Sequence, residues 1–390
     1  MKMLPLFVVG IALTNSLVFA ETSVDEAVVE SVAFLLSVQE GPANAEWPYE
    51  GVYRVRGDGP AAFKKRGSII PMGYRVGGTS IAGIALSRAP EIDEPRREAI
   101  ERARQFVVTS TESPDMSPEY GGGYDVRGWG YIYAIRFLVA LEAAGLVPSD
   151  EKEANRAAVD FYLKGVAAIE IPKNGGWNYA RRGPLDASGA ASPFMTAPAL
   201  QALYEAKRAG FDVDEAMVRR GLQGLSNTLA KDGNIVYSAQ GPTKANAAGL
   251  PGAIGRMVAV ETVRLQGGEG SVEEVEHAVE AFFEHWEELL KRKSKNGTHE
   301  GPYGVAPYYF FYAHGYAAEA IEELPEAKRA ALRKRLADLL FEVREDDGSW
   351  NDRVFPRSKA YGTAQALWVF TQPSTTPARW QSKSKDAPSK

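Results

Sequence analysis

The stretch Gly348-Ser349-Trp350, followed by Thr363-Ala364-Gln365-Ala366-Leu367, decides how this sequence folds. A near copy stands earlier in the chain as Gly175-Gly176-Trp177 with Thr196-Ala197-Pro198-Ala199-Leu200. Such copies are a direct sign of an internal repeat, and a repeat sets the architecture before any single residue does. The loop pattern recurs in full or weaker form at 45–47, 122–124, 175–177, 233–235, 301–303 and 348–350. The chain is therefore predicted to consist of six helical hairpins.

The two helices of each predicted hairpin differ in composition. The helix before the fifth loop has an apolar stripe at helical spacing, with Glu273, Glu276 and Glu280 on the opposite face. The stripe consists of Val275, Val279, Phe282, Phe283, Trp286 and Leu290. Helices after the loops, such as 79–86, 131–141, 196–203 and 363–369, are rich in small residues and poor in charge. We expect the first kind to lie outside and the second to be buried inside.

These features predict an all-α fold, an α6/α6 toroid with an inner and an outer ring of helices. Strand signals are almost absent, and no linker divides the chain before Gln372. A single domain over 21–371 is therefore predicted. An open solenoid of six hairpins is the alternative.

The two ends of the chain differ from this repeat. Lys2, an apolar core over 6–13 and the small residues before a cleavage point after Ala20 are typical of a signal peptide at 1–20. The mature protein is then expected to be periplasmic or extracellular, without a transmembrane span, and a retained N-terminal anchor is the alternative. The segment 372–390 is rich in Pro, Ser, Thr and Lys, so we predict a disordered tail.

Composition excludes several function classes. The 390 residues contain no cysteine, which removes thiolate nucleophiles and cysteine-based zinc sites. Four histidines are present, and His277 and His285 have no third ligand close in sequence, so no metal site is predicted. The formal net charge of −5 argues against nucleic-acid binding. No phosphate loop, dinucleotide fingerprint or nucleophile elbow is present, and no cofactor is expected.

The order of helix end, Gly-x-aromatic loop and Ala-rich helix resembles the repeat of squalene cyclases and protein prenyltransferase β-subunits. The best match is 346–350 with 363–367, and the second is 173–177 with 196–200. The resemblance covers the chain from the predicted cleavage site to about Phe370. It implies the α6/α6 toroid and a cavity inside the inner ring, which could hold a small-molecule, lipid or glycan ligand.

This sequence departs from the catalytic motifs of that superfamily. The nearest run to an Asp-x-Asp-Asp motif is 212–215, which sits at a predicted helix start, where acidic residues cap the N-terminus. The Asp, Cys and His ligands of the prenyltransferase zinc cannot be assembled without cysteine. Whether the chain is an enzyme stays open at this point.

Candidate ligand-binding residues lie where cations accompany aromatic residues near the loops. Aromatic faces stack on sugars or apolar ligands, and arginine binds carboxylate or phosphate. His314 opens an inner helix behind a run of aromatic residues and is a candidate acid or base. The alternative is that the aromatic residues are hairpin wedges, which we favour for Trp177 and Trp350, and that His314 is a satisfied core residue. The candidates are Asp125, Arg127, Trp129, Tyr179, Arg181, Arg182, Tyr308, Tyr309, Tyr312 and His314.

Three hypotheses follow. The first is an exported ligand-binding or scaffold protein on a terpenoid-cyclase-like toroid, because the sequence shows no evident pair of catalytic acid and base. The second is a secreted glycan-active enzyme, a polysaccharide lyase or glycosidase, with roles for Arg127, Arg181, Tyr179 and His314. The third is an atypical isoprenoid-handling cyclase or transferase with an apolar cavity.

Overall fold

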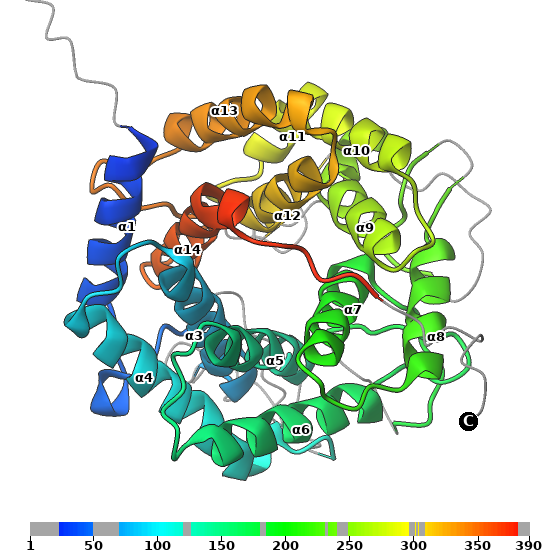
Figure 1. Ribbon diagram of the computed structural model, residues 1–390. Coiled ribbons are helices and arrows are strands. Elements are labelled where there is room, and N and C mark those ends of the chain that lie inside the picture. The colour runs from blue at the N-terminus through cyan, green and yellow to red at the C-terminus, as the bar shows by residue number, and fades with distance from the viewer. Residues whose placement is uncertain are drawn as a thin grey trace, which may run out of the picture.

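Helices arranged in two concentric rings make up the protein (Figure 1). The computed structural model describes residues 23–49, 70–119, 126–179, 185–230, 233–239, 249–295, 301, 303 and 309–380. The inner ring consists of α3 (Met72–Arg88), α5 (Arg127–Ala143), α7 (Pro193–Arg208), α9 (Ile254–Gln266), α12 (Tyr309–Glu323) and α14 (Ser358–Thr371). The outer ring consists of α1 (Val24–Ser37), α4 (Glu94–Thr109), α6 (Lys152–Ala168), α8 (Glu215–Ser226), α10 (Val272–Glu284), α11 (Trp286–Leu290) and α13 (Glu326–Glu342). Short 3-10 helices stand at Pro42–Asn44, Ser110–Glu112, Pro114–Met116, Leu250–Gly252 and Gln372–Ser374.

The predicted α6/α6 toroid is confirmed. Burial separates the two rings as the compositions predict: every residue of α12 is buried, whereas α13 buries only Leu336, Ala337 and Leu340. Isolated β-bridges occur, but no strand forms in the described part of the chain. None of the described helices is long and apolar enough to cross a membrane.

Local sequence signals set the helix ends. Ser271 and Glu274 form a reciprocal capping box at the start of α10. In the acidic run 212–215, the Asp214 side chain accepts a hydrogen bond from the amide of Ala216 at 2.8 Å and caps α8. The capping interpretation of that run is therefore confirmed. Gly175, Gly176, Gly233 and Gly348 have positive φ in their loops, a conformation in which glycine avoids the steric cost of a Cβ.

One tryptophan linkage joins the outer and inner helices in three hairpins. Trp177 donates its indole N–H to the carbonyl of Val166 on α6 at 2.8 Å. Its backbone amide donates to the hydroxyl of Thr196 on α7 at 3.0 Å. The same pair of bonds occurs at Trp47 with Leu35 and Thr79, and at Trp350 with Leu340 and Thr363. All three indoles are almost completely buried, so the hypothesis that Trp177 and Trp350 are hairpin wedges is confirmed.

The ring closes between its first and last hairpins. Helix α14 packs against both α1 and α3 (Figure 1). Arg357 donates to the Glu40 carboxylate at 2.6 Å, and Tyr49 donates to Asp352 at 3.2 Å. The open solenoid is therefore excluded.

The segment after α14 crosses the end of the ring where the inner helices finish, toward α7 (Figure 1, red). The carbonyl of Thr376 accepts from Arg208 at 2.8 Å, and the amide of Trp380 donates to the carbonyl of Gln266 at 2.9 Å. Arg379 pairs with the buried Glu323. The predicted disorder is therefore wrong for Gln372–Trp380, because aromatic and cationic side chains in it find partners on the ring. The rest of the predicted tail, 381–390, and the predicted signal peptide, 1–20, lie outside the described residues.

The tryptophan linkage predicts how Thr196 contributes to stability. Thr196→Val keeps the shape but leaves the Trp177 amide without its acceptor, so we expect a loss of about 1–3 kcal/mol in the free energy of unfolding. Thr196→Ser keeps the hydroxyl and should lose only about 1 kcal/mol for the missing methyl group. Urea unfolding of both variants measures the difference, and equal losses would contradict the linkage.

Candidate functional site at the rim where the inner helices begin

All inner helices begin at the same rim of the ring. Each hairpin runs from an outer helix through a loop to an inner helix, so the inner helices are parallel (Figure 1). Their N-terminal ends place partial positive charge at this rim. The first turn of each carries a large side chain, namely Tyr74, Trp129, Phe194, Arg256, Tyr309 and Tyr361. We call the aromatic residues of this set, together with Tyr49 and Tyr133, the aromatic belt.

One half of the belt surrounds Trp129, a residue predicted to bind ligand. Its indole lies 5.4 Å from the ring of Tyr133 and 6.0 Å from that of Tyr49, between ring centroids. The centroids of Tyr49 and Tyr361 are 4.8 Å apart. Trp129 fits here because Gly77 of α3 has no Cβ, which would stand 2.2 Å from the indole. The sequence signal at Trp129 therefore marks a real cluster, to which α3, α5 and α14 contribute.

Asp352 is a fully buried carboxyl group beside this cluster. Its Oδ2 accepts from the Tyr49 hydroxyl at 3.2 Å, while Oδ1 has no hydrogen-bond partner among the described residues. Burial raises the pKa of Asp352 to about 7, although the neighbouring Arg353 acts in the opposite direction. The group is therefore a carboxylic acid that keeps much of its proton near neutral pH.

The other half of the belt contains a trio of tyrosines, Tyr179, Tyr237 and Tyr309. The hydroxyls of Tyr179 and Tyr309 are 2.6 Å apart, and Tyr309 donates to the hydroxyl of Tyr237 at 3.3 Å. Tyr309 stacks on Phe194. Two predicted site residues from different hairpins, Tyr179 and Tyr309, are thus brought into contact.

A buried arginine, Arg256 of α9, lies next to this trio. Only 4% of its surface is exposed, and its Nε donates to the carbonyl of Ile235 at 2.9 Å. Burial lowers the pKa of Arg256 to about 10, and the nearby tyrosine hydroxyls of Tyr309, Tyr237 and Tyr179 offset this only in part. The guanidinium still carries its charge at neutral pH.

An ion cluster fills the ring below the belt. Arg136 pairs with Glu205 at 2.9 Å and with Glu319 at 3.4 Å. Tyr316 donates to Gln201 at 2.9 Å, and Gln201 donates in turn to Glu319. The space left here is about 10 Å³, room for roughly one water molecule. Together with the segment 372–380, this cluster closes the far end of the ring.

His314 is not at the belt, contrary to its prediction as a ligand-binding candidate. Its Nε2 accepts the indole N–H of Trp286 at 2.9 Å, so Nδ1 carries the proton and donates to the carbonyl of Phe310 at 2.8 Å. It is fully buried in the wall between α12 and the outer ring, and burial lowers its pKa to about 4. The alternative of a satisfied core histidine is the correct one.

Of the remaining predicted ligand-binding residues, the structure describes only Arg127 and Tyr312. Arg127 is buried and donates to the carbonyl of Ser117, a structural contact at the rim. Tyr312 is buried beside the belt, with its ring 5.2 Å from Phe194. The other candidates, Asp125, Arg181, Arg182 and Tyr308, lie outside the described residues. Within the described residues, no group of three His, Asp or Glu side chains is placed to hold a metal ion.

Asp352 and Arg256 are not among the residues predicted from the sequence. A signal existed for each: Asp352 follows Trp350-Asn351 in the most typical loop, and Arg256 is a lone cation at the start of a helix of small and apolar residues. Neither signal reveals that the group is buried, because burial depends on hairpins far apart in the chain.

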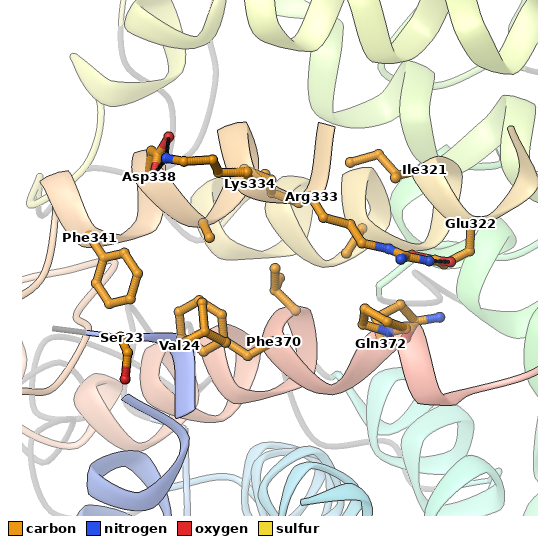
Figure 2. Close-up of a pocket in the computed structure, with 15 residues that line it drawn as sticks. Ser23, Val24, Ile321, Glu322, Arg333, Lys334, Asp338, Phe341, Phe370 and Gln372 are labelled. Carbon is orange, nitrogen blue, oxygen red and sulfur yellow. Dashed lines mark hydrogen bonds and ion pairs between the residues drawn. The ribbon is translucent and has the colours of Figure 1, made fainter. Parts of the chain in front are cut away.

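A hollow of about 550 Å³ lies on the outside, between α13, α14 and the start of α1 (Figure 2). Its floor is apolar, with Phe341 and Phe370 facing into it. The charges at its edge satisfy one another, as Arg333 pairs with Glu322 and Lys334 with Asp338 at 2.8 Å. No buried polar atom of its described lining lacks a partner, so the belt is the better candidate site.

Comparison with known proteins supports the fold. No family model matches the chain, and no curated protein matches it. Among solved structures, the type II terpene cyclase MstE from Scytonema is similar, with 16% identity, 90% of this chain and 98% of that chain covered, and a TM-score of 0.50. The GH76A α-1,6-mannanase from Salegentibacter sp. has 10% identity, coverage of 90% and 99%, and a TM-score of 0.55. A D-mannose isomerase has 11% identity, coverage of 91% and 98%, and a TM-score of 0.56. At these identities the likeness shows a shared α/α toroid, and the chemistry must come from this chain's own residues.

The buried side chains of Asp352 and His314 predict opposite effects of pH on stability. The raised pKa of Asp352 stabilises the fold below pH 3.8, and this contribution is lost as the pH rises to about 7. The lowered pKa of His314 stabilises the fold above pH 6.5, and this contribution is lost as the pH falls to about 4. Asp352→Asn should therefore gain about 4 kcal/mol relative to wild type between pH 4 and 8.

His314→Gln, which can still accept from Trp286, serves as the matched variant with the opposite sign. It should gain about 3 kcal/mol relative to wild type as the pH falls from 7 to 4. Unfolding free energies across this range measure both effects. A pH-independent difference for either variant would show that its group titrates alike in the folded and unfolded states.

Proposed function

We propose that this protein binds a small organic ligand against the aromatic belt, at the rim where the inner helices begin. One observation carries the proposal: all six inner helices direct a large aromatic or cationic side chain to this rim, and two buried polar atoms there, Oδ1 of Asp352 and Nη2 of Arg256, have no partner among the described residues. A buried polar group without a partner destabilises a fold by about 1–3 kcal/mol. A ligand that hydrogen-bonds to these two groups would remove that cost.

A second candidate function, acid catalysis, is favoured by the state of Asp352. A protonated carboxyl group in an apolar setting can deliver its proton to an alkene or to an ether oxygen, and a pKa near the working pH suits a general acid. Glycoside hydrolysis ordinarily needs a second carboxylate within about 10 Å. The rings of Tyr49, Trp129 and Tyr361 beside Asp352 give this acid an apolar setting, which suits an isoprenoid-type substrate.

The test is native mass spectrometry of the full mature chain after incubation with lipid and glycan extracts. We expect wild type to retain a ligand and Trp129→Ala to lose it, because the indole forms the centre of one half of the belt. Trp380→Ala, at the far end of the ring, is the control and should retain it. A folded wild type that retains nothing from either extract would overturn the proposal.

We also propose that the protein is exported, on the strength of the predicted signal peptide at 1–20. N-terminal sequencing of the protein recovered from a secreting host should begin at Glu21. An intact Met1 on protein from the outer compartment would instead support a retained anchor.

A further inference from the structure

Arg256 differs in its partners from Arg136 and Arg104, two other strongly buried arginines. Arg136 pairs with Glu205 and Glu319, and Arg104 pairs with Glu101 and Glu151, both at 2.7 Å. Arg256 forms no ion pair, and its Nη2 lacks any hydrogen-bond partner among the described residues. Removing a guanidinium from water is costly unless an anion compensates it. Glutamates provide that compensation at Arg136 and Arg104, whereas no described carboxylate pairs with Arg256.

The groups that face Arg256 are neutral or positive. On neighbouring elements stand the hydroxyls of Tyr179, Tyr237 and Tyr309 and the ring of Phe194, whose centroid is 5.8 Å from the guanidinium carbon. The N-terminal ends of α7, α9 and α12 add partial positive charge at the same rim. Among the described residues, no acidic side chain is one of the charged groups that act on the pKa of Arg256. Everything described around this guanidinium therefore suits a negative group that the chain does not itself contribute.

We propose that Arg256 binds the carboxylate of an organic ligand, with the tyrosine trio orienting that carboxylate and the ligand's apolar face lying along the aromatic belt. A single guanidinium balances one negative charge, which matches a carboxylate better than a multiply charged phosphate. Charge-assisted bonds from arginine to carboxylate are among the strongest in proteins. The inference rests on the proposed binding function, and it names the class of ligand.

Two classes of compound combine a carboxylate with a surface that aromatic rings can cover, namely fatty acids and acidic oligosaccharides. The first arm of the test compares palmitate with methyl palmitate, and the second compares trigalacturonate with its methyl ester. Each ester preserves shape and removes the charge. We expect one acid to bind wild type about 10- to 100-fold more tightly than its ester in isothermal titration. The arm that responds identifies the source.

Variants separate binding from folding. Arg256→Gln can still donate to Ile235, so its melting temperature should equal or exceed that of wild type, while its affinities for the acid and the ester should become equal. Arg136→Gln is the matched control, because it leaves Glu205 and Glu319 without their cation and should lower the melting temperature by several degrees. Tyr237→Phe removes one hydroxyl of the trio. It should weaken the binding of the acid several-fold and leave the affinity for the ester unchanged.

Several outcomes overturn the inference. They are equal binding of acid and ester by wild type, failure of both acids to bind, and an Arg256→Gln variant that unfolds as readily as Arg136→Gln. The broader binding function fails separately, since it falls only if wild type also retains nothing from the lipid and glycan extracts. A neutral ligand retained equally by wild type and Arg256→Gln would keep that function and reject the carboxylate.

Discussion

The linkage of tryptophan to an outer-helix carbonyl and an inner-helix threonine is the constraint on which this structure depends. An indole N–H and a backbone amide, both buried, must each find an acceptor. Trp177 can make both hydrogen bonds only if the end of α6 and the start of α7 lie at a fixed distance from each other. Trp47 and Trp350 make the same bonds in their hairpins. Because the loop always leads inward from the C-terminal end of an outer helix, every inner helix points the same way. The common direction of the inner helices therefore follows from a packing requirement.

Parallel inner helices make the two ends of the ring electrostatically unlike. The end where they finish gathers partial negative charge, and Arg88, Lys207, Arg208 and Arg264 stand there, the arrangement that helix dipoles favour. That end is closed by the Arg136 cluster and by the crossing segment 372–380. The opposite end carries partial positive charge, aromatic side chains, and Asp352 and Arg256, each with a buried polar atom that has no partner among the described residues. The two ends of the ring therefore differ in partial charge and in the type of side chain they present.

The sequence was sufficient to predict the toroid, the two rings and the wedge role of Trp177 and Trp350, because these depend on patterns local to one hairpin. It also predicted Trp129, Tyr179 and Tyr309 as site residues, since aromatic residues at loop ends point to the rim in this fold. It failed at His314, because a helix buried on all sides has no periodicity to show which face meets the cavity. Asp352 could not be found in this way either, as its partner Tyr49 comes from the opposite end of the chain.

The separation of Asp352 and Arg256 bears on what the ring can do. Asp352 lies on the loop before α14 and Arg256 lies on α9, with α12 between these elements in the ring (Figure 1). Each keeps a buried polar atom that has no partner among the described residues, and an ion pair between them would not by itself offset the cost of burying both charges. The two proposed roles, binding and acid catalysis, can act on one ligand only if that ligand spans the rim from α9 to the loop before α14.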